Sequence, residues 1–175
     1  AKYTKNKRDS YMVGALARFN NNYDQLLPRA KEAARKLGLK APCHNPFMIT
    51  VAQLVECFHV AEHSLSLIDQ ILARGVEEED NRVRVRAGRG VGAVEAPRGV
   101  LFHDYTYNGQ GVLTEANCII PTNQNHNNIQ KDLESLVPQI LDRSRDEIRH
   151  TLEMVVRAYD PCISCSAHSL RVTFK

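Results

Sequence analysis

The sequence predicts a mainly α-helical chain with a small antiparallel β-sheet, an α+β fold. Two segments, a short one over 22–39 and a long one over 47–72, have apolar residues at helical spacing. The region that follows them is instead rich in Val, Tyr and Gly and contains Asn108-Gly109, which is typical of a hairpin. Two more helical segments come after this region. With 175 residues and 43% hydrophobic content, one domain over 1–175 is the simplest organisation.

The first two helices are predicted from periodicity and stop signals. In 22–39 the apolar residues recur every three or four positions, and Gly38 is a plausible stop. In 47–72 the same period continues for about seven turns before Gly75. A helix of this length is expected to be a principal element of the core.

The sheet is predicted from alternation and turn residues. Val83 and Val85 alternate with arginines in 82–86, the glycines of 88–92 suggest turns, and 99–118 has strand-like composition. Asn108-Gly109 suits a tight turn because both residues tolerate positive φ. The acidic residues of 77–80 are expected in a solvated loop.

Two further helices are expected after Pro121, one with apolar residues over 129–140 and one over 148–156. Pro138 leaves the end of the first uncertain, because proline interrupts helical hydrogen bonding. Ser144 with Glu147 predicts a capping box at the start of the second.

The composition excludes several classes of protein. A net charge of +3 is too small to indicate nucleic-acid binding, and no basic segment is interleaved with aromatic residues. No apolar run approaches the length of roughly 20 residues that spans a bilayer. The odd number of cysteines, 5, favours reduced thiols, and we therefore expect a cytoplasmic protein.

The segment Cys162-Ile163-Ser164-Cys165-Ser166-Ala167-His168 carries the strongest functional signal. Thiolates three positions apart can bind one metal ion or bridge two, and histidine is a further ligand type. Half of a zinc site, a redox dithiol and two merely adjacent buried cysteines remain open from the spacing alone. Zinc needs a second ligand pair, for which Cys43-His44 and Cys57 with His59 fit only loosely.

The segment 157–168 resembles the C-terminal nickel-ligand motif of the large, catalytic subunit of nickel-iron hydrogenases. Three other segments are similar to that subunit in the same order: 11–18 (YMVGALAR), 95–99 (EAPRG) and 119–123 (IIPTN). The resemblance extends over essentially the whole chain, which would form the C-terminal part of the large-subunit fold. The residues of the cysteine motif are most similar to those of the cytosolic, cofactor-coupled branch of these hydrogenases.

The resemblance implies a nickel-iron centre whose iron carries carbon monoxide and cyanide. Cys162 would be a terminal nickel thiolate and proton acceptor, and Cys165 would bridge nickel and iron. Arg98 would lie over the open metal position with Asp160 as its hydrogen-bonding neighbour. For that pair, an ordinary ion pair is the alternative interpretation.

Other residues would complete the centre by the same resemblance. Thr122 would hydrogen-bond a cyanide, while Ala96, Pro97 and Ile120 would form the apolar wall around the diatomic ligands. His168 would bind magnesium or a similar ion, with the backbone carbonyl of Cys118 as a possible further ligand. A surface histidine is the alternative for His168.

Several residues have simpler interpretations. His103 suits a hydrogen-bond network or a partly buried position on a strand. His59 and His63 lie one helical turn apart, a spacing that can bind metal but that more often marks a polar helix face. Cys43, Cys57 and Cys118 are expected to be small buried residues.

The family's N-terminal Arg-x-Cys-Gly-x-Cys motif, which supplies two more thiolates, is not in this sequence. The resemblance therefore implies an N-terminal part of the large subunit on a separate chain, together with a small subunit that holds iron-sulfur clusters. Electron-transfer subunits linked to nicotinamide, deazaflavin or heterodisulfide are also implied. A non-catalytic scaffold and a structural zinc domain are the alternative functions.

The segment 169–175 is a tail beyond the position at which the family's peptidase commonly cleaves. It is expected either as an unprocessed end or as a permanent terminus. Leu170, Val172 and Phe174 alternate with polar residues, which predicts a short strand that packs on the protein.

Overall fold

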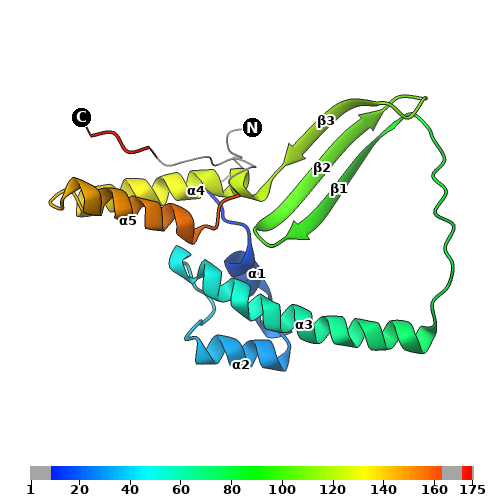
Figure 1. Cartoon of the computed structure of the whole chain (residues 1–175), viewed down its shortest axis with the longest axis horizontal. Helices are drawn as coiled ribbons and strands as arrows, with labels where there is room; N and C mark the ends of the chain where they lie inside the picture. The colour runs from blue at the N-terminus through cyan, green and yellow to red at the C-terminus, as the bar shows by residue number, and fades with distance from the viewer. Residues whose placement is uncertain (1–8, 163–170, 175) are drawn as a thin grey trace.

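The computed structural model of this protein describes residues 9–162 and 171–174. Within these residues, helices surround one end of a three-stranded antiparallel sheet, so the predicted fold class is confirmed (Figure 1). The helices and strands, in chain order, are α1 (Ala15–Asn22), α2 (Pro28–Lys36), α3 (Ile49–Arg74), β1 (Gly88–Ala96), β2 (Gly99–Tyr107), β3 (Leu113–Ile119), α4 (Pro121–Leu136) and α5 (Arg145–Ala158). Short 3-10 turns are η1 (Tyr23–Gln25), η2 (Pro46–Met48) and η3 (Val137–Gln139). No helix in the described part of the chain is long and apolar enough to span a membrane.

The helix predicted over 22–39 begins later in the structure, and the preceding helix α1 was not predicted. Helix α1 ends at Asn22, a 3-10 turn follows, and α2 begins only at Pro28. Leu27 is extended because the ring of a following proline disfavours the helical conformation at the residue before it. The predicted stop is correct, since Gly38 has a φ of 72° just beyond the end of α2.

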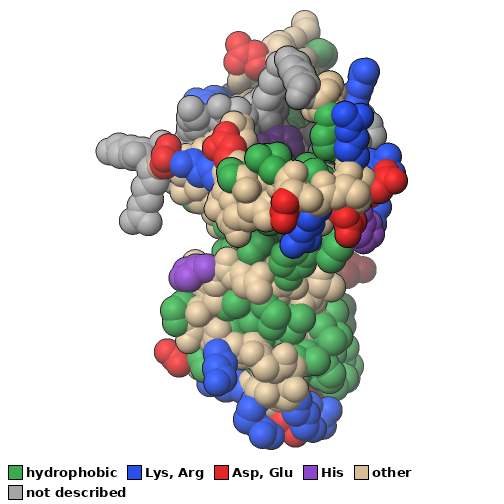
Figure 2. All heavy atoms as spheres, turned by 90° about the vertical axis from the view of Figure 1, so that its left-hand side faces the viewer, with side chains coloured by type: hydrophobic (Ala, Val, Ile, Leu, Met, Phe, Trp, Pro, Cys, Tyr) green, Lys and Arg blue, Asp and Glu red, His purple; other side chains and the backbone are tan. Residues whose placement is uncertain are grey.

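Helix α3 agrees with its prediction and ends at Gly75, whose φ is 86°. Its first turns are buried through Ile49, Ala52 and Val55. Its C-terminal end extends past α1 and α2 (Figure 1), and many of its apolar side chains are exposed. Figure 2 shows hydrophobic side chains exposed over the lower part of the molecule, where α2 and α3 lie in Figure 1.

The sheet contains a strand that the sequence did not suggest. Residues 88–92 form part of β1 rather than turns, and 82–86 are exposed without regular structure. The glycines at 88, 90 and 92 pair with Tyr107, Tyr105 and His103 of β2, so the strand leaves room for large rings on its neighbour. The absence of side chains at these positions is therefore compatible with a strand.

The hairpin around Asn108 is correctly placed, but its loop is longer than a two-residue turn. The backbone N–H of Asn108 donates to the carbonyl of Val112 at 3.0 Å. The side chain of Asn108 accepts bonds from the N–H groups of Gln110 and Val112. Gly111, and not Gly109, supplies the positive φ of 77°.

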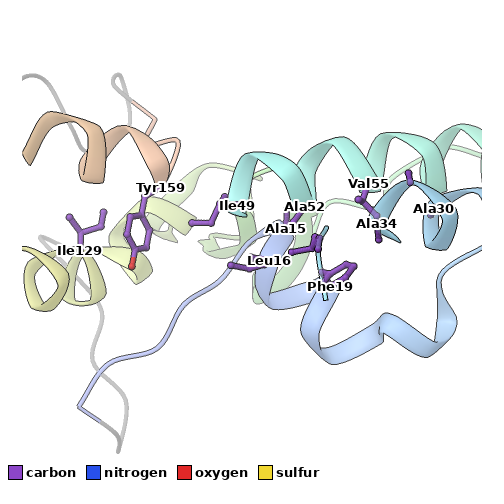
Figure 3. Close-up of a cluster of buried hydrophobic side chains, with 12 residues drawn as sticks. Ala15, Leu16, Phe19, Ala30, Ala34, Ile49, Ala52, Val55, Ile129 and Tyr159 are labelled. Carbon is purple, nitrogen blue, oxygen red and sulfur yellow. The ribbon is translucent and has the colours of Figure 1, made fainter. Parts of the chain in front are cut away.

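The main core lies between α1, α2 and α3 and continues to α4 and α5 (Figure 3). Leu16, Phe19 and Val55 are 2% exposed or less, and Ile129 and Tyr159 close the end near α4 and α5. A second cluster, Ile140, Ile148 and Leu152, packs α5 against the end of α4. These clusters fix the ends of α3, α4 and α5 relative to one another.

The second half of the chain otherwise follows its predictions. Helix α4 ends at Leu136, and Pro138 lies in the 3-10 turn η3 that follows. The capping box of α5 is present, since the side chains of Ser144 and Glu147 bond reciprocally with each other's backbone N–H.

The described part of the tail, Arg171 to Phe174, has no strand, so the predicted strand is wrong over these residues. It does pack on the protein. Val172 contacts the second hydrophobic cluster, and the Arg145 guanidinium lies 5.2 Å from the centre of the Phe174 ring.

Tyr159 joins α5 to α4, and its removal tests this joint. Its hydroxyl donates to Asp132 at 2.6 Å and accepts from Asn128 at 2.8 Å, in a site where the residue is 4% exposed. Tyr159→Phe leaves both partners unsatisfied, so we expect a loss of about 1–3 kcal/mol in the free energy of unfolding. Denaturant titration at neutral pH measures this loss.

The same residue predicts a pH dependence. Burial, and then the bond to Asp132, raise the pKa of Tyr159 above its ordinary value. The folded protein therefore favours the neutral phenol, and stability is lost as the pH rises above the unfolded value of about 10. Tyr159→Phe should remove this alkaline loss, and an unchanged alkaline profile would contradict the assignment.

Candidate metal centre

Arg98 lies in the tight turn between β1 and β2. Ala96 and Gly99 are the closing pair of this hairpin, so Pro97 and Arg98 are its two loop residues. The Arg98 Nε donates to the backbone carbonyl of Asp160 at 2.6 Å, and its Nη2 donates to the Asp160 carboxylate at 3.1 Å. The turn is thereby joined to the segment that follows α5.

Asp160 ends α5 in a left-handed conformation with a φ of 48°. Asp tolerates this conformation better than most residues, and the following Pro161 cannot continue a helix. The Asp160 N–H donates to the carbonyl of Arg157, while its carboxylate also accepts a bond from Gln53 of α3 at 2.9 Å. The chain is thus directed away from α5 immediately before the cysteine motif.

Cys162 lies beside the start of α4. Its backbone N–H donates to the hydroxyl oxygen of Thr122 at 3.2 Å, and Thr122 is 3% exposed. A hydroxyl can accept and donate at once, so this contact is compatible with a further bond from Thr122. The Cys162 sulfur is disulfide-bonded in this structure, whereas metal binding needs the reduced thiolate.

The predicted ligands Cys165 and His168 lie outside the described residues. The structure brings together Arg98, Asp160, Thr122 and Cys162 from three separate parts of the chain. Ile120 is the N-cap residue of α4, directly before Pro121 and Thr122. The structure therefore links Arg98 to Asp160, two residues before Cys162, and links the Cys162 backbone to the Thr122 hydroxyl.

Arg18 of α1 holds the turn that carries Arg98. Its guanidinium bonds both oxygens of Glu56, at 2.6 and 2.8 Å, and also the Glu95 carboxylate at 2.6 Å. It further donates to the backbone carbonyls of Ala96 and Pro97, each at 3.0 Å. The bond to Glu56 is the largest influence raising the pKa of Arg18, against the opposing effect of burial.

Two glycines let the N-terminal segment approach this turn closely. Gly99 has a φ of 137°, and a Cβ there would lie 2.5 Å from a methyl carbon of Val13. Gly14 has a φ of 112°, and a Cβ there would lie 2.9 Å from the carbonyl oxygen of Arg98. Larger residues at either position would separate α1 from the turn.

Buried amides at the start of α4 bind the backbone of other segments. The Asn125 side chain accepts from the N–H of Val13 at 2.8 Å and donates to its carbonyl at 3.2 Å. The Gln124 side chain donates to the carbonyl of Val100 at 2.7 Å. These bonds fix Thr122 relative to the N-terminal segment and β2.

A groove of about 720 Å³ runs between α1 and α3 and reaches the β1–β2 turn. Ala96 and Pro97 line it, together with Gln53 and Arg18. These two predicted wall residues therefore border the groove, whereas Ile120 and Thr122 lie at the start of α4.

His103, Tyr105 and Cys118 form a polar cluster on the sheet. The Tyr105 hydroxyl lies 2.7 Å from His103 Nδ1 and 3.5 Å from the Cys118 sulfur. The bond to Cys118 is the main cause that raises the pKa of Tyr105. His103 is half-buried on β2, which agrees with its interpretation as a strand histidine in a hydrogen-bond network.

The rings of His59 and His63 have centres 5.9 Å apart. His59 Nδ1 accepts a bond from the N–H of Leu27 at 3.2 Å, which ties α3 to the start of α2. Within residues 9–162 and 171–174, no group of three or more His, Cys, Asp or Glu side chains is arranged to hold a metal ion.

The expectation that three cysteines are buried is wrong. Cys43 is half-buried, and Cys57 and Cys118 are exposed. Cys57 lines the groove between α1 and α3, and Cys118 lies on the edge strand β3, so neither side chain is enclosed by the described residues.

Sequence reasoning missed Arg18, Gln53 and the amides of α4 as parts of the site. Arg18 stood within a recognised segment but had no assigned role. The run Asn123-Gln124-Asn125 at a helix start was a usable signal, because such a polar run is buried only where it finds hydrogen-bond partners.

The chain belongs to the nickel-dependent hydrogenase family, whose sequence model matches residues 2–168. It is 36% identical to the alpha component of sulfhydrogenase 1 from Pyrococcus furiosus over 98% of this chain and 40% of that protein. It is 33% identical to a component of the F420-non-reducing hydrogenase from Methanothermobacter marburgensis over 91% of this chain and 35% of that protein.

The fold also matches a solved hydrogenase. The crystal structure of an NAD+-reducing [NiFe]-hydrogenase in the H2-reduced state superposes with a TM-score of 0.74 at 29% identity, covering 91% of this chain and 36% of that chain. The chain thus spans about 40% of the curated relatives' length and corresponds to their C-terminal portion. The recognised family and fold are both confirmed.

Substitution of Arg18 tests whether its bonds to Glu56 and to the β1–β2 turn stabilise the protein more than an exposed ion pair does. Arg18→Lys loses the paired bonds to Glu56 and the bonds to the turn carbonyls, because an ammonium cannot reproduce a planar fork. We expect a loss of about 1–3 kcal/mol in the free energy of unfolding. Thermal or denaturant unfolding of the purified protein measures it.

Arg89→Lys is the matched control. Arg89 bonds Asp104 at 2.6 Å, but its side chain is 65% exposed, so the substitution should cause no measurable change. Equal effects of the two substitutions would show that Arg18 is an ordinary surface ion pair.

Proposed function

We propose that this chain is the C-terminal part of the catalytic subunit of a hydrogenase that reversibly splits dihydrogen into protons and electrons. The observation that carries the proposal is the contact of Arg98 with Asp160, two residues before Cys162, whose N–H bonds Thr122. These residues come from three of the four segments that resemble the family.

The side chains fit half of a nickel-iron site. Cys162 and Cys165 would supply two thiolates, which suit nickel and iron, and the chain supplies a cation and a hydroxyl beside Cys162. When bound, the nickel-iron centre with its carbon monoxide and cyanide ligands would supply the binding and polarisation of dihydrogen. Two further thiolates would come from outside these 175 residues.

Each residue of the chain then has a defined task. The Cys162 sulfur would accept a proton, since a thiolate beside the reacting molecule is a positioned base. Arg98 would present a fixed positive charge there, and its two bonds to Asp160 hold the guanidinium in place. Thr122 would donate its hydroxyl hydrogen to a cyanide, while Ala96, Pro97 and Ile120 would exclude water from the diatomic ligands.

His168 would bind magnesium or a similar hard ion near the end of the chain. The backbone carbonyl of Cys118 would be a further ligand. Cys118 lies on β3 two residues before Ile120, so this carbonyl belongs to the segment that leads into α4.

The remaining two thiolates would come from the N-terminal part of the large subunit, which is not covered by these residues. A small subunit with iron-sulfur clusters would carry the electrons. The name of one relative, an NAD+-reducing hydrogenase, makes a nicotinamide system the acceptor to test first. The deazaflavin and heterodisulfide systems implied by the sequence resemblance would be tested next, in a cytoplasmic complex.

The infrared spectrum of the anaerobically isolated native complex tests this function. Stretches of metal-bound carbon monoxide and cyanide should be present, because the proposed centre carries both ligands on its iron. Their absence from an intact, homogeneous complex would favour a non-catalytic scaffold. One zinc per chain would favour a structural zinc domain.

Arg98→Lys tests the assigned role of the guanidinium. A lysine keeps the charge but cannot make both bonds to Asp160, so we expect dihydrogen turnover to fall by about 10²-fold or more with the metal content unchanged. Hydrogen uptake and metal analysis of the same preparation measure the two quantities.

Arg89→Lys again serves as the control and should turn over normally, since its ion pair with Asp104 lies on the exposed sheet. Full activity in Arg98→Lys would reduce the Arg98–Asp160 contact to a structural ion pair.

A further inference from the structure

The side chain of Gln53 on α3 joins that helix to Asp160. Its Nε2 donates to Asp160 Oδ2 at 2.9 Å, across 107 positions of the sequence. The main core anchors both ends of this bond, since Ala52 and Val55 beside Gln53 are 0% exposed. Tyr159, which precedes Asp160, is 4% exposed in the same core. Packing therefore fixes α3 relative to Asp160.

The two carboxylate oxygens of Asp160 have different hydrogen-bond partners. Oδ1 accepts from Nη2 of Arg98 at 3.1 Å, whereas Oδ2 accepts from Gln53. Oδ2 also lies 3.1 Å from Nε of Arg98, which donates to the Asp160 carbonyl. A carboxylate rotates readily about its last side-chain bond, because that torsion has broad minima. Gln53 restricts the rotation with a donor from a separate helix.

The ion pair between Arg98 and Asp160 does not fix this geometry by itself. The two side chains are 40% and 37% exposed, so water competes for both charges. Ion pairs with such exposure have little preference for one arrangement. Among the residues that the structure describes, Asp160 is the one hydrogen-bond partner of the Arg98 guanidinium. The position of the guanidinium therefore depends on how the carboxylate is held.

An uncharged donor suits position 53. A lysine or arginine there would form its own ion pair with Asp160 and would compete with Arg98. An amide donates a hydrogen bond without adding charge, so the charge of Asp160 stays balanced by Arg98 alone. Gln53 also lines the groove that reaches the β1–β2 turn, so it lies near the base of the loop that carries Arg98.

We propose that Gln53 is a positioning residue of the candidate metal centre. It holds the Asp160 carboxylate in the orientation that receives the Arg98 guanidinium, and the guanidinium thereby keeps its place relative to Cys162. The inference rests on the proposed function for the reaction that this arrangement serves. Gln53 acts through Asp160 and Arg98 and not on the reacting molecule.

Gln53→Met in the native complex tests this role, because methionine keeps the length of the side chain but has no donor. The kcat for dihydrogen should fall by about tenfold, since a small displacement of a charged group at a reaction site is costly. The KM for dihydrogen and the metal content should stay the same. Hydrogen uptake over a range of dihydrogen concentrations, with metal analysis, measures these quantities. An unchanged kcat would contradict the positioning role.

Gln70→Met is the matched control on the same helix. Gln70 is exposed and donates to Ser66 Oγ at 3.2 Å, so this variant loses a side-chain hydrogen bond away from the centre. Its kcat should equal that of the unaltered complex. An equal fall in the two variants would show a general disturbance of α3 and no specific role for Gln53.

A double substitution separates positioning from a structural role. The lysine of the Arg98→Lys variant cannot make both bonds to Asp160, so the orientation of the carboxylate matters less there. Adding Gln53→Met to that variant should therefore change kcat by less than about twofold. A further tenfold fall would mean that Gln53 acts independently of Arg98, and the proposal would be wrong.

Hydrogen–deuterium exchange of the isolated complex tests the contact without measuring activity. The backbone N–H of Asp160 donates to Arg157, and that of Cys162 donates to Thr122. Exchange of these two hydrogens should rise by about tenfold in Gln53→Met, because local opening becomes easier. Gln70→Met should leave it unchanged. Equal exchange in Gln53→Met and the unaltered complex would reject the contact.

This measurement keeps the two proposals separable. Faster exchange in Gln53→Met, in a complex that lacks the infrared bands of metal-bound diatomic ligands, would reject the hydrogenase activity and retain the ordering of Asp160 by Gln53. Those bands together with unchanged exchange and unchanged kcat in Gln53→Met would retain the activity and reject the role of Gln53.

Discussion

The guanidinium of Arg18 joins α1, α3 and the β1–β2 turn, because its donors reach the carboxylates of Glu56 and Glu95 and the carbonyls of Ala96 and Pro97. The turn would otherwise be a two-residue loop at the end of an exposed hairpin. With Arg18 in place, the backbone on the N-terminal side of Arg98 is fixed. Arg98 can then hold Asp160 in a set position, and the direction of the chain into Cys162 follows.

The helices were the most predictable part of the fold, and the reasons are local. Helix α3 has a long apolar period and a terminating glycine, and α5 has a complete capping box. Helix α1 was not predicted, and the start of α2 was predicted six residues too early because the apolar period begins at Tyr23, while a single proline makes Leu27 extended. Strand β1 was missed because its glycines matter only opposite the large rings of β2.

The motif residues of the candidate site could be predicted from the sequence, but the residues that hold them in position could not. Arg98, Asp160 and Cys162 follow from segments that resemble a family, and the structure brings these residues together. The residues that hold them could not be read from spacing. Arg18 contacts Glu56 across 38 positions and Gln53 contacts Asp160 across 107, so each pairing depends on how the helices pack. The prediction that the cysteines are buried was wrong for a related reason, since Cys57 lines an open groove and Cys118 lies on an edge strand, and neither position can be read from the sequence alone.

The amides at the start of α4 have a consequence for the order of folding. The bonds of Asn125 to Val13 link residues 112 positions apart, so they cannot form until this long loop has been closed. Closing so long a loop is entropically unfavourable until other contacts have been made. The part of the core between α1, α2 and α3, whose residues are closer in sequence, can therefore form first. The backbone around Thr122 then reaches its final position late. A chain that folds in this order leaves Cys162 accessible until the start of α4 has packed against the N-terminal segment.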